Sequence, residues 1–318
     1  MNNLPLISIV IPTHNRKKLV DRLIHSIYKS TYANIEIFVI DDASIDDTYL
    51  YLKEKYKRKN VFLIRNKISH YVSYCRNKGA KMAKGKYIFF VDDDNVLPRN
   101  LLQELVNIFE ADKKIGEVGP MIYSYKNKQE LLWMKTQRSM LTTKTNFPRD
   151  LQTIKNNQRW DTDDIPNAFM VKSKVVKGNA IYFNEKLFPI HYEESDYAYR
   201  IRKLGYKIVV ASRAIIYHDV QEENGGAFRH YMEDPKRTYF NARNRLVFHG
   251  LYSDTYQKWI IILFWNWAFA FYYIFNIVFF TGSMKISWKQ KKKLVFAYLQ
   301  GCKDGLFVVV PSLFAYVN

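Results

Sequence analysis

Short apolar runs alternate with amphipathic stretches along the first two-thirds of the chain. The runs that are mainly apolar, without regular alternation, lie at 6–12, 35–41, 61–66 and 86–92. Strands of this kind belong in a parallel sheet that is covered on both faces. The stretches between them, at 16–30, 46–56 and about 70–84, repeat apolar residues at helical spacing. This alternation predicts a Rossmann-like, doubly wound α/β domain, whose ligands bind beyond the carboxyl ends of its strands.

The pattern is less regular from about 115 to 220. Residues 115–125 and 168–176 are typical of strands, and 206–218 of two short strands. A helix is expected over 193–205, ended by Gly205. On this helix Tyr197, Ile201 and Leu204 are expected to form a buried apolar stripe. Asp196 and Arg200 are four residues apart and can form an ion pair.

Acidic residues follow the predicted strands although acid is scarce in this chain, whose formal net charge is +19. In extended chain Asp92 and Asp94 point to one side and Asp93 to the other. Converging carboxylates repel unless a cation lies between them, and oxygen ligands suit Mg²⁺ or Mn²⁺. The alternative is an acidic turn that caps a helix beginning near Pro98. The spacing alone leaves both interpretations open.

A second acidic cluster opens the helix predicted at 193–205. Glu193 and Glu194 stand in its first turn, where the helix dipole favours carboxylates. They either stabilise the helix or include a general base. His218 ends a strand in the same region, although a lone histidine is more often structural.

The bulk composition narrows the class of protein. A chain of 318 residues makes one large domain with an appendage, or two domains. Its two cysteines cannot form a disulfide framework, which favours a reduced, intracellular setting. The positive charge indicates a polyanionic partner: nucleic acid, anionic lipid or a phosphorylated substrate.

Five ordered motifs resemble a known family. SIVIPTHNR, IFVIDDASIDDT, RNKGAKMAKGKYIFFVDDDN, EESDYAYRIRKLGYKIVVASRAIIYH and RTYFNARNR occur in the order found in the family 2 inverting glycosyltransferases of GT-A fold. The rhamnosyltransferase-like branch is the most similar. The resemblance covers roughly residues 5–250 and strongly favours the metal interpretation of Asp92 and Asp94.

The resemblance implies a nucleotide site and a metal site. The residues that match nucleotide-contacting positions are Pro12, Thr13, Asn15, Asp41, Asp42, Arg76 and Asn77. Asp92 and Asp94 match the DxD motif that bridges Mg²⁺ or Mn²⁺ to the diphosphate, with His218 as a further ligand. Asp93 is then expected to serve the donor sugar or a local hydrogen bond.

The resemblance also implies a catalytic helix and an acceptor region. The family's acidic helix aligns with Glu193, Glu194, Asp196 and Arg200, and its base falls on Glu194. Because the base is usually Asp, Glu193 remains an alternative. Trp160 has frequent counterparts in the acceptor region, and Asn167 stands where many members have Gly.

The chemistry implied is a single displacement. Glu194 takes the proton of an acceptor hydroxyl, whose oxygen attacks the anomeric carbon of a nucleotide-diphosphate sugar and inverts it. The metal offsets the charge on the departing diphosphate. A catalytically inactive scaffold of the same fold is the main alternative. A nucleic-acid-binding protein explains the acids at the strand ends poorly, so no nucleic-acid partner is expected.

The C-terminal region has a different composition. Residues 259–281 are 23 residues without a formal charge, and five lysines fall within 285–293. We expect a catalytic domain at 1–250, divided near 115 into nucleotide-binding and acceptor halves, and a membrane-associating region at 251–318. A single crossing would place the lysines outside, against the positive-inside tendency, so an interfacial or re-entrant segment is favoured.

Two further expectations follow for this region. If the region associates with the membrane, the enzyme lies at the cytoplasmic side of the cell membrane, near a glycan or polyprenyl-phosphate-linked acceptor. Candidates for binding phosphate there are Arg237, Arg243 and Arg245. The alternative is that the helix packs on the catalytic domain or on a second copy, which makes a homo-oligomer.

Overall fold

The computed structural model describes residues 4–57, 60–149, 159–219, 234–279 and 286–314. The chain forms two compact units. Unit 1 comprises Met1–Gln137, Phe147–Glu185 and Glu193–Val220, and unit 2 comprises Arg138–Asn146, Lys186–Tyr192 and Gln221–Asn318. The expected boundary at residue 250 instead falls inside a helix of unit 2.

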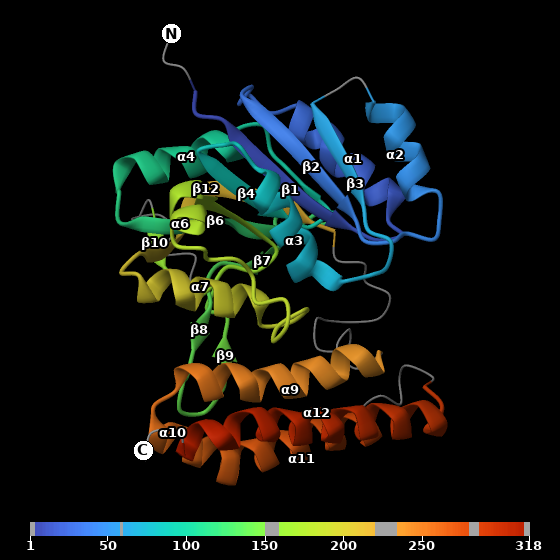
Figure 1. Cartoon of the computed structure of the whole chain (residues 1–318), viewed down its shortest axis with the longest axis vertical. Helices are drawn as coiled ribbons and strands as arrows, with labels where there is room; N and C mark the ends of the chain where they lie inside the picture. Colours follow the sequence, from blue (N-terminus) through green and yellow to red (C-terminus); the bar gives the residue numbers. More distant parts are fainter. Residues whose placement is uncertain (1–3, 58–59, 150–158, 220–233, 280–285, 315–318) are drawn as a thin grey trace. The chain divides into compact units, whose positions relative to one another are not determined.

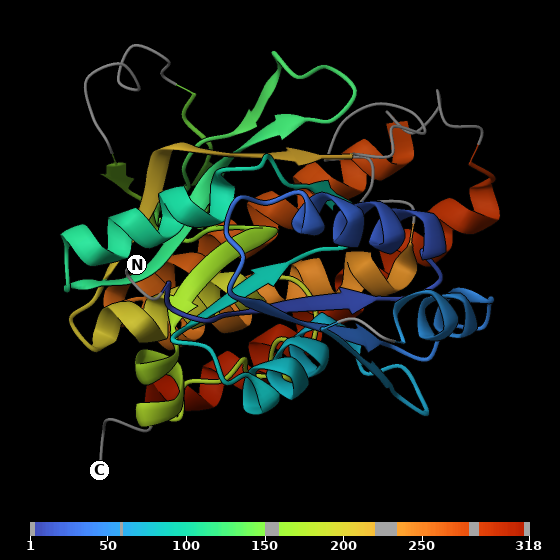
Figure 2. The same ribbon diagram turned by 90° about the horizontal axis from the view of Figure 1, so that it is seen from above.

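One half of unit 1 follows the predicted β–α alternation (Figure 1). Four parallel strands stand in the order β4-β1-β2-β3: β1 (Ile7–Thr13), β2 (Ile35–Asp41), β3 (Val61–Arg65) and β4 (Tyr87–Val91). The helices between them are α1 (Lys17–Tyr28), α2 (Thr48–Tyr56) and α3 (Tyr71–Met82). Figure 2 shows α1 and α3 on opposite faces of these strands. Strands β2 and β3 are added on one side of β1, and β4 is added on its other side. Right-handed crossovers therefore place α3 on the face of the sheet opposite α1.

The other half of unit 1 makes the sheet mixed rather than parallel. Its elements are β5 (Asn95–Val96), α4 (Leu101–Ala111), β6 (Ile115–Ser124), β7 (Leu131–Trp133), β10 (Arg159–Asp161), β11 (Ala168–Lys172), α6 (Ser173–Gly178), α7 (Glu193–Lys203) and β12 (Lys207–His218). Strand β11 is antiparallel to both β4 and β6, whereas β12 is parallel to β6. Strand β12 also pairs with β5, so that His218 lies opposite Asn95, directly after the acids that follow β4.

Three local expectations for unit 1 were wrong. The stretch 168–176 is a strand only to Lys172, because the chain turns there into α6. Residues 207–218 form one strand with a register shift between Ala211 and Ile215, not two strands. Leu204 is 44% exposed because α7 ends at Lys203. Gly205 has φ +83°, which confirms its place at the helix end.

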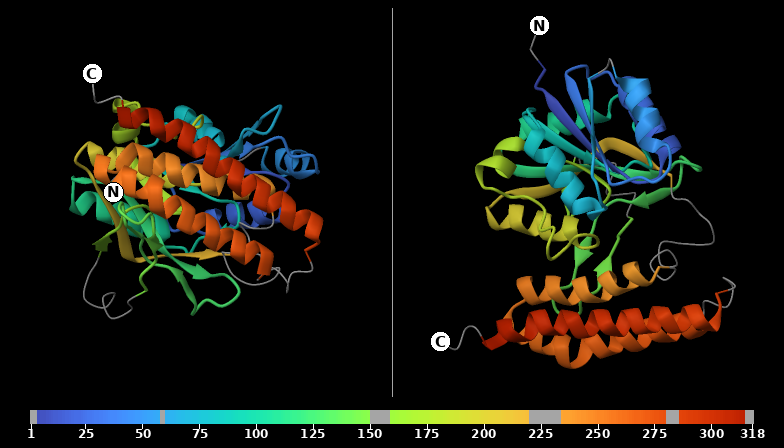
Figure 3. Two further views of the ribbon diagram at one scale, coloured as in Figure 1. Left: turned by 90° about the horizontal axis from the view of Figure 1, so that it is seen from below. Right: turned by 45° about the vertical axis from the view of Figure 1, so that its right-hand side comes forward.

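Unit 2 is mainly helical. Its helices are α9 (Pro235–Tyr252), α10 (Thr255–Ile260), the π-helical turn η1 (Ile261–Trp265), α11 (Asn266–Phe279) and α12 (Trp288–Phe314). A small two-stranded sheet, β8 (Gln137–Arg138) with β9 (Thr145–Asn146), precedes them in the chain. Helices α9, α11 and α12 pack side by side (Figure 3).

Glycines let α9 and α12 approach closely. A methyl group at Gly301 would collide with the carbonyl oxygen of Tyr239, and one at Gly305 would come within 3.0 Å of the carbonyl oxygen of Arg243. This GxxxG spacing places both glycines on the same face of α12. Gly250 of α9 accepts Val309 of α12 in the same way. These contacts join the polar helix α9 to the apolar helix α12. The composition did not indicate this pairing, because α9 precedes the apolar segment that begins at residue 259.

Two stretches of unit 2 are long and apolar enough to cross a membrane: Thr255–Phe279 and Trp288–Pro311. Little of them is covered, since 22% and 33% of their most apolar windows are buried. The large apolar side chains exposed on them include Trp259, Leu263, Phe264, Trp267, Phe271, Phe275, Phe279, Phe296 and Phe307. Residues 280–285 and 315–318, on which parts of the predicted hydrophobic and lysine-rich segments fall, lie outside the described residues.

Candidate active site

The three acids after β4 do not alternate as extended chain would require. The strand ends at Val91 and the chain turns, with the backbone N–H of Asn95 donating to the carbonyl of Asp92 at 3.3 Å. Asp93 and Asp94 therefore contact the same cation, Arg16, whose Nη1 lies 2.9 and 3.1 Å from their carboxylates. The expectation that Asp92 and Asp94 converge while Asp93 points away was wrong, because it assumed that the strand continues.

Asp92 instead belongs to a cluster around Arg76. The Nη2 of Arg76 donates to Asp92 at 2.8 Å and to Glu194 at 2.9 Å, and its Nη1 lies 3.6 Å from Glu193. Only 1% of Arg76 is exposed. Helix α3 supplies the arginine, the end of β4 supplies Asp92 and the first turn of α7 supplies the two glutamates. The guanidinium therefore links the first acid after β4 to the predicted base.

The two glutamates of this cluster differ in protonation. Burial and the neighbouring Glu194 charge raise the pKa of Glu193 to about 8, against the lowering effect of Arg76. Burial also raises the pKa of Glu194, to about 6, while Arg76 lowers it. The pKa is thus raised on both glutamates, and more on Glu193 than on Glu194. A carboxylate with its pKa near the working pH suits general-base catalysis.

The backbone at Asn167 also holds Glu194. Asn167 has φ +71°, a left-handed conformation that glycine and asparagine tolerate better than other residues. In this conformation its N–H donates to the Glu194 carboxylate at 2.9 Å, and its side chain exchanges hydrogen bonds with Asn95. Asn167 thus contacts Glu194 from a backbone conformation that few residues other than glycine and asparagine adopt.

His218 at the end of β12 contacts Asp94, with its Nε2 3.3 Å from the carboxylate. Burial raises the pKa of Asp94, but the His218 hydrogen bond and charge lower it overall, so this carboxylate is ionised. Burial lowers the pKa of His218, but its contacts with Asp94 raise it overall. An ionised oxygen ligand next to an imidazole fits a divalent cation. Among the described residues, however, no group of three or more His, Cys, Asp or Glu surrounds one point.

The loops after β1 and β2 bind each other. Asn15 has φ +53°, and its side-chain oxygen accepts from the backbone N–H of Ile45 at 2.7 Å. Asp41 is fully buried, accepts from Ser44 and lies 3.4 Å from the Nε of Arg65. The exposed Asn15 and the buried Asp41 thus hold the two loops at the carboxyl ends of β1 and β2.

Asp42 and Asn77 also have partners within the fold. Asp42 accepts hydrogen bonds from Asn66, Ser69 and the N–H groups that open α3, and although burial raises its pKa, these bonds lower it overall. Asn77 exchanges two hydrogen bonds with the backbone of Phe183. The predicted nucleotide role of both residues remains a prediction.

The remaining predicted residues of unit 1 are distributed as follows. Thr13 donates to Asp93 at 2.7 Å, while Pro12 is half-buried in β1. Asp196 pairs with Arg200 at 2.7 Å, as expected, and is not part of the Arg76 cluster. Trp160 packs in the core on β10 opposite Val210, far along β12 from His218. The predicted residues therefore form two groups, Asp94 with His218, and Asp92 with Glu193 and Glu194 around Arg76. Asp196 and Trp160 belong to neither group.

Arg237, Arg243 and Arg245 lie on α9 in unit 2. Arg243 donates to the carbonyl of Leu187 at 2.7 Å. Arg245 is 5% exposed, lies 4.4 Å above the ring of Phe269 and has two nitrogens, Nε and Nη1, without a hydrogen-bond partner among the described residues.

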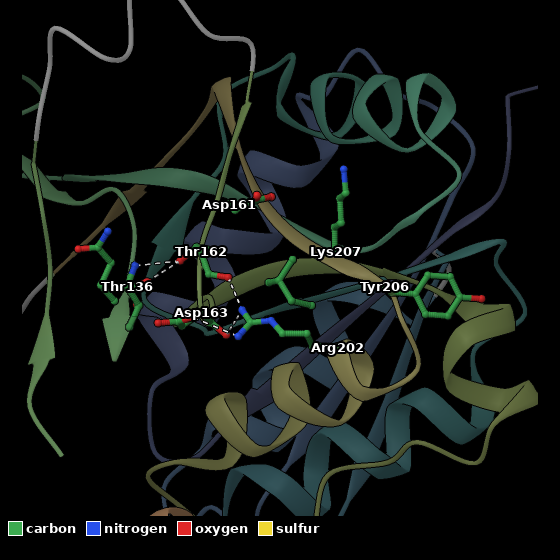
Figure 4. Close-up of a pocket in the computed structure, with 9 residues that line it drawn as sticks. Thr136, Asp161, Thr162, Asp163, Arg202, Tyr206 and Lys207 are labelled. Atoms are coloured by element: carbon green, nitrogen blue, oxygen red, sulfur yellow. Dashed lines mark hydrogen bonds and ion pairs between the residues drawn. The ribbon is translucent and has the colours of Figure 1, made fainter. Parts of the chain in front are cut away.

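A pocket of about 460 Å³ opens at the other end of β12 (Figure 4). Lys207, the first residue of β12, lines it together with Arg202, Asp161 and Asp163. Figure 4 shows Arg202 directed at Asp163 and at the backbone of Thr162, which it contacts at 3.1 and 2.7 Å. This pocket contains none of the predicted site residues.

Arg16 is the residue that sequence reasoning missed. It ends the SIVIPTHNR motif and comes directly before α1. Its role could have been inferred from two facts: Arg16 follows the loop after β1, and the acids after the neighbouring strand β4 require a nearby cation.

The comparisons with known proteins identify the family and the fold. The family model described as glycosyl transferase family 2 matches residues 8–177. A β-1,3-glucosyltransferase of Escherichia coli, WfaP, is 32% identical over 122 residues, 38% of this chain and 45% of its own length. The Staphylococcus aureus poly(ribitol-phosphate) β-N-acetylglucosaminyltransferase TarP is 34% identical over 119 residues, 36% of each chain. The matches thus span less than half of the length of these curated relatives.

Solved structures share the fold. The crystal structure of S. aureus TarS 1–349 has a TM-score of 0.58 at 19% identity, covering 97% of this chain and 82% of that chain. GalNAc-T7 with UDP, GalNAc and Mn²⁺ has a TM-score of 0.64 at 18% identity, covering 99% and 58%. The fold is therefore GT-A, as expected, although the rhamnosyltransferase-like branch is not singled out. With more than half of its residues matched by the family model, the chain belongs to glycosyl transferase family 2.

Proposed function

We propose that the protein moves a sugar from a nucleotide-diphosphate donor to a hydroxyl group of a glycan or lipid-linked acceptor, with inversion at the anomeric carbon. The observation that carries this proposal is that buried Arg76 donates to both Glu194 and Asp92 at the carboxyl end of the sheet. In an open α/β sheet this edge is where ligands bind. Relatives named as glycosyltransferases for UDP-glucose and N-acetylglucosamine support the substrate class.

Glu194 is the proposed general base. Its ionised carboxylate accepts the proton of the acceptor hydroxyl while that oxygen bonds to the anomeric carbon, and the bond from this carbon to the diphosphate oxygen breaks. Arg76 and the N–H of Asn167 fix the direction of the carboxylate. Glu193 lacks the second of these contacts, which favours Glu194 as the base.

Asp94 and His218 are the proposed ligands of Mg²⁺ or Mn²⁺, since they are adjacent and Asp94 is ionised. Asp92 would join them only by leaving Arg76. When bound, the cation would offset the charge of the departing diphosphate. Thr13 would keep Asp93 in place beside it.

For the membrane, we propose that unit 2 lies in the interface rather than crossing the bilayer. Helix α9 covers α12 from Tyr298 to Val309 through the glycine contacts. If α12 crossed, α9 would carry Arg243 and its neighbours into the hydrocarbon, which is costly. The exposed aromatic side chains of α11 and α12 suit an interfacial helix, and Lys289, Lys292 and Lys293 at the start of α12 suit anionic headgroups. This arrangement supports a position at the cytoplasmic side of the membrane.

Flotation with vesicles tests this placement. Replacing Trp267 and Phe271 by Ser should release the protein from vesicles that contain anionic lipid. The control is Phe62→Ser, which removes an aromatic side chain that is also exposed but lies on β3 in unit 1. Release by the control alone, or by neither variant, would contradict interfacial docking through α11.

Arg245 is the proposed contact for an acceptor phosphate. A buried guanidinium with two unpartnered nitrogens requires an anion, and phosphate oxygens match its geometry.

The function itself is tested by turnover. A panel of nucleotide sugars, beginning with UDP-glucose and UDP-GlcNAc, is incubated with Mn²⁺ or Mg²⁺ and with or without a polyprenyl-diphosphate-linked sugar. Release of nucleoside diphosphate that stops on adding EDTA is expected for at least one donor. Absence of turnover with every donor would favour the inactive-scaffold alternative.

A further inference from the structure

Arg16 contacts two acids that follow β4, Asp93 and Asp94, which are called the acidic edge below. Its Nη1 lies 2.9 Å from Asp93 and 3.1 Å from Asp94. The two acids are nearly covered, with side chains 5% and 16% exposed, whereas 40% of the Arg16 side chain is exposed. The arginine therefore reaches its partners from the solvent side, and its side chain is free to leave them without opening the core.

Asp94 has two competing partners in this arrangement. One of its oxygens contacts Arg16 and the other contacts His218. A divalent cation on Asp94 would lie next to the guanidinium, and like charges at contact distance repel. A cation and Arg16 therefore bind this carboxylate in competition.

We propose that Arg16 neutralises the acids at this edge when no donor is bound, and moves to the diphosphate of the donor when one binds. The inference rests on the proposed function. A diphosphate offers paired oxygens to a guanidinium fork, which makes it a better partner for Arg16 than an Asp94 carboxylate that already binds a metal. The exchange keeps the charge of the site balanced in both states, so that the metal binds firmly only together with the donor.

Contact with the acidic edge is specific to Arg16 and is not shared by the next residue, Lys17. Lys17 pairs with Asp47 at 2.6 Å on the surface and contacts neither acid of the edge. The backbone of Arg16 directly precedes the first turn of α1, which holds it in place. Only the Arg16 side chain therefore needs to move.

Two binding measurements test the exchange. Mn²⁺ binding without nucleotide is followed by electron paramagnetic resonance, and UDP binding with saturating Mn²⁺ by calorimetry, with GDP as a second probe. Arg16→Ala should bind Mn²⁺ alone about tenfold more tightly than wild type, because the competitor is gone. It should bind UDP about tenfold or more weakly, because a charge-assisted bond is lost. Arg16→Lys should change both affinities in the same directions by less, and Lys17→Ala should change neither.

The opposite signs make the result decisive. If Arg16→Ala weakens both affinities, or leaves both unchanged, the inference is wrong. Should Arg16→Ala fail to fold, the smaller opposite changes in Arg16→Lys decide in the same way. Failure of wild type to bind either nucleotide with Mn²⁺ would instead contradict the proposed function, and is recognised without any variant.

Discussion

Arg76 in unit 1 and Arg245 in unit 2 are both buried, with 1% and 5% of their surface exposed, but their surroundings differ. Arg76 contacts three carboxylates that come from two other elements. Arg245 has no carboxylate within ion-pair distance among the described residues, and its contacts are the ring of Phe269 and the hydroxyl of Tyr298. The first guanidinium is neutralised inside the fold, whereas the second has no carboxylate partner among the described residues.

The difference separates two ways of preparing a site. Around Arg76 the cost of burying charge is met when the protein folds, so that the base is already oriented before any substrate arrives. Around Arg245 no carboxylate of the described residues meets that cost, and the acceptor phosphate proposed above would offset it with its binding energy. The first arrangement suits catalysis, and the second suits capture of a charged group.

The largest effect is expected from Glu194→Gln. The amide keeps the shape of the side chain but cannot accept the proton, so kcat should fall by about 10²- to 10⁴-fold. UDP affinity in the presence of Mn²⁺ should stay the same, since the substitution leaves Asp94, His218 and Arg16 intact. Glu193→Gln is the matched control and should keep most of the rate. A greater loss in Glu193→Gln than in Glu194→Gln would reassign the base.

Arg76→Met should be the most destabilising change in the cluster. It leaves the buried Glu193 and the partly exposed Asp92 and Glu194 without their cation, which costs about 3 kcal/mol. Thermal unfolding should shift down by roughly 10 °C for a protein of this size. Arg76→Lys, which keeps the charge, should lose less. An unchanged melting temperature in Arg76→Met would show that the acids do not depend on this contact.

The elements of unit 1 were predictable where one local signal dominates. Strands β1, β2 and β4 are mainly apolar, and their observed bounds differ from the predicted ones by one residue at most. Helix α7 has an acidic first turn and a glycine after its end, and both were identified. The signal was weaker in 168–176, where β11 passes directly into α6 within one apolar run.

The geometry of the site was less accessible to sequence reasoning. Side-chain directions after β4 depend on a turn at Asp93 and Asp94, which alternation cannot reveal. The burial of Arg76 depends on acids 16 and 118 residues away in the chain. The assignment of α9 to unit 2 depends on backbone contact at Gly301, and no composition signal marks that contact. Resemblance identified which residues form the site but not which of them touch.

Arg245→Met sharpens the comparison because its expected sign differs from that of Arg76→Met. Methionine has similar length and no charge, so removing an unpaired buried cation should leave stability unchanged or raise it by about 1 kcal/mol. Affinity for a polyprenyl-diphosphate-linked acceptor should fall, while UDP affinity stays the same. Melting temperature and acceptor KM measure the two effects. A destabilisation as large as that of Arg76→Met would make Arg245 a structural residue and remove the contrast.

The smallest effect concerns the pH dependence of stability in the Arg76 cluster. Burial and the Glu194 charge raise the pKa of Glu193 from 4.5 to about 8 in the folded state. Between these values the folded protein holds a proton that the unfolded chain has lost, so the stability of wild type should decline as pH rises through this window. Glutamine cannot titrate, and the melting temperature of Glu193→Gln should decline less from about pH 5 to pH 8. Part of the decline below about pH 6 should persist, since burial raises the pKa of Glu194 as well. Glu54→Gln, an exposed change beside Lys57, is the control and should follow wild type. Parallel curves for wild type and Glu193→Gln would mean that Glu193 is ionised in the fold, and Arg76 would then neutralise three charged acids rather than two.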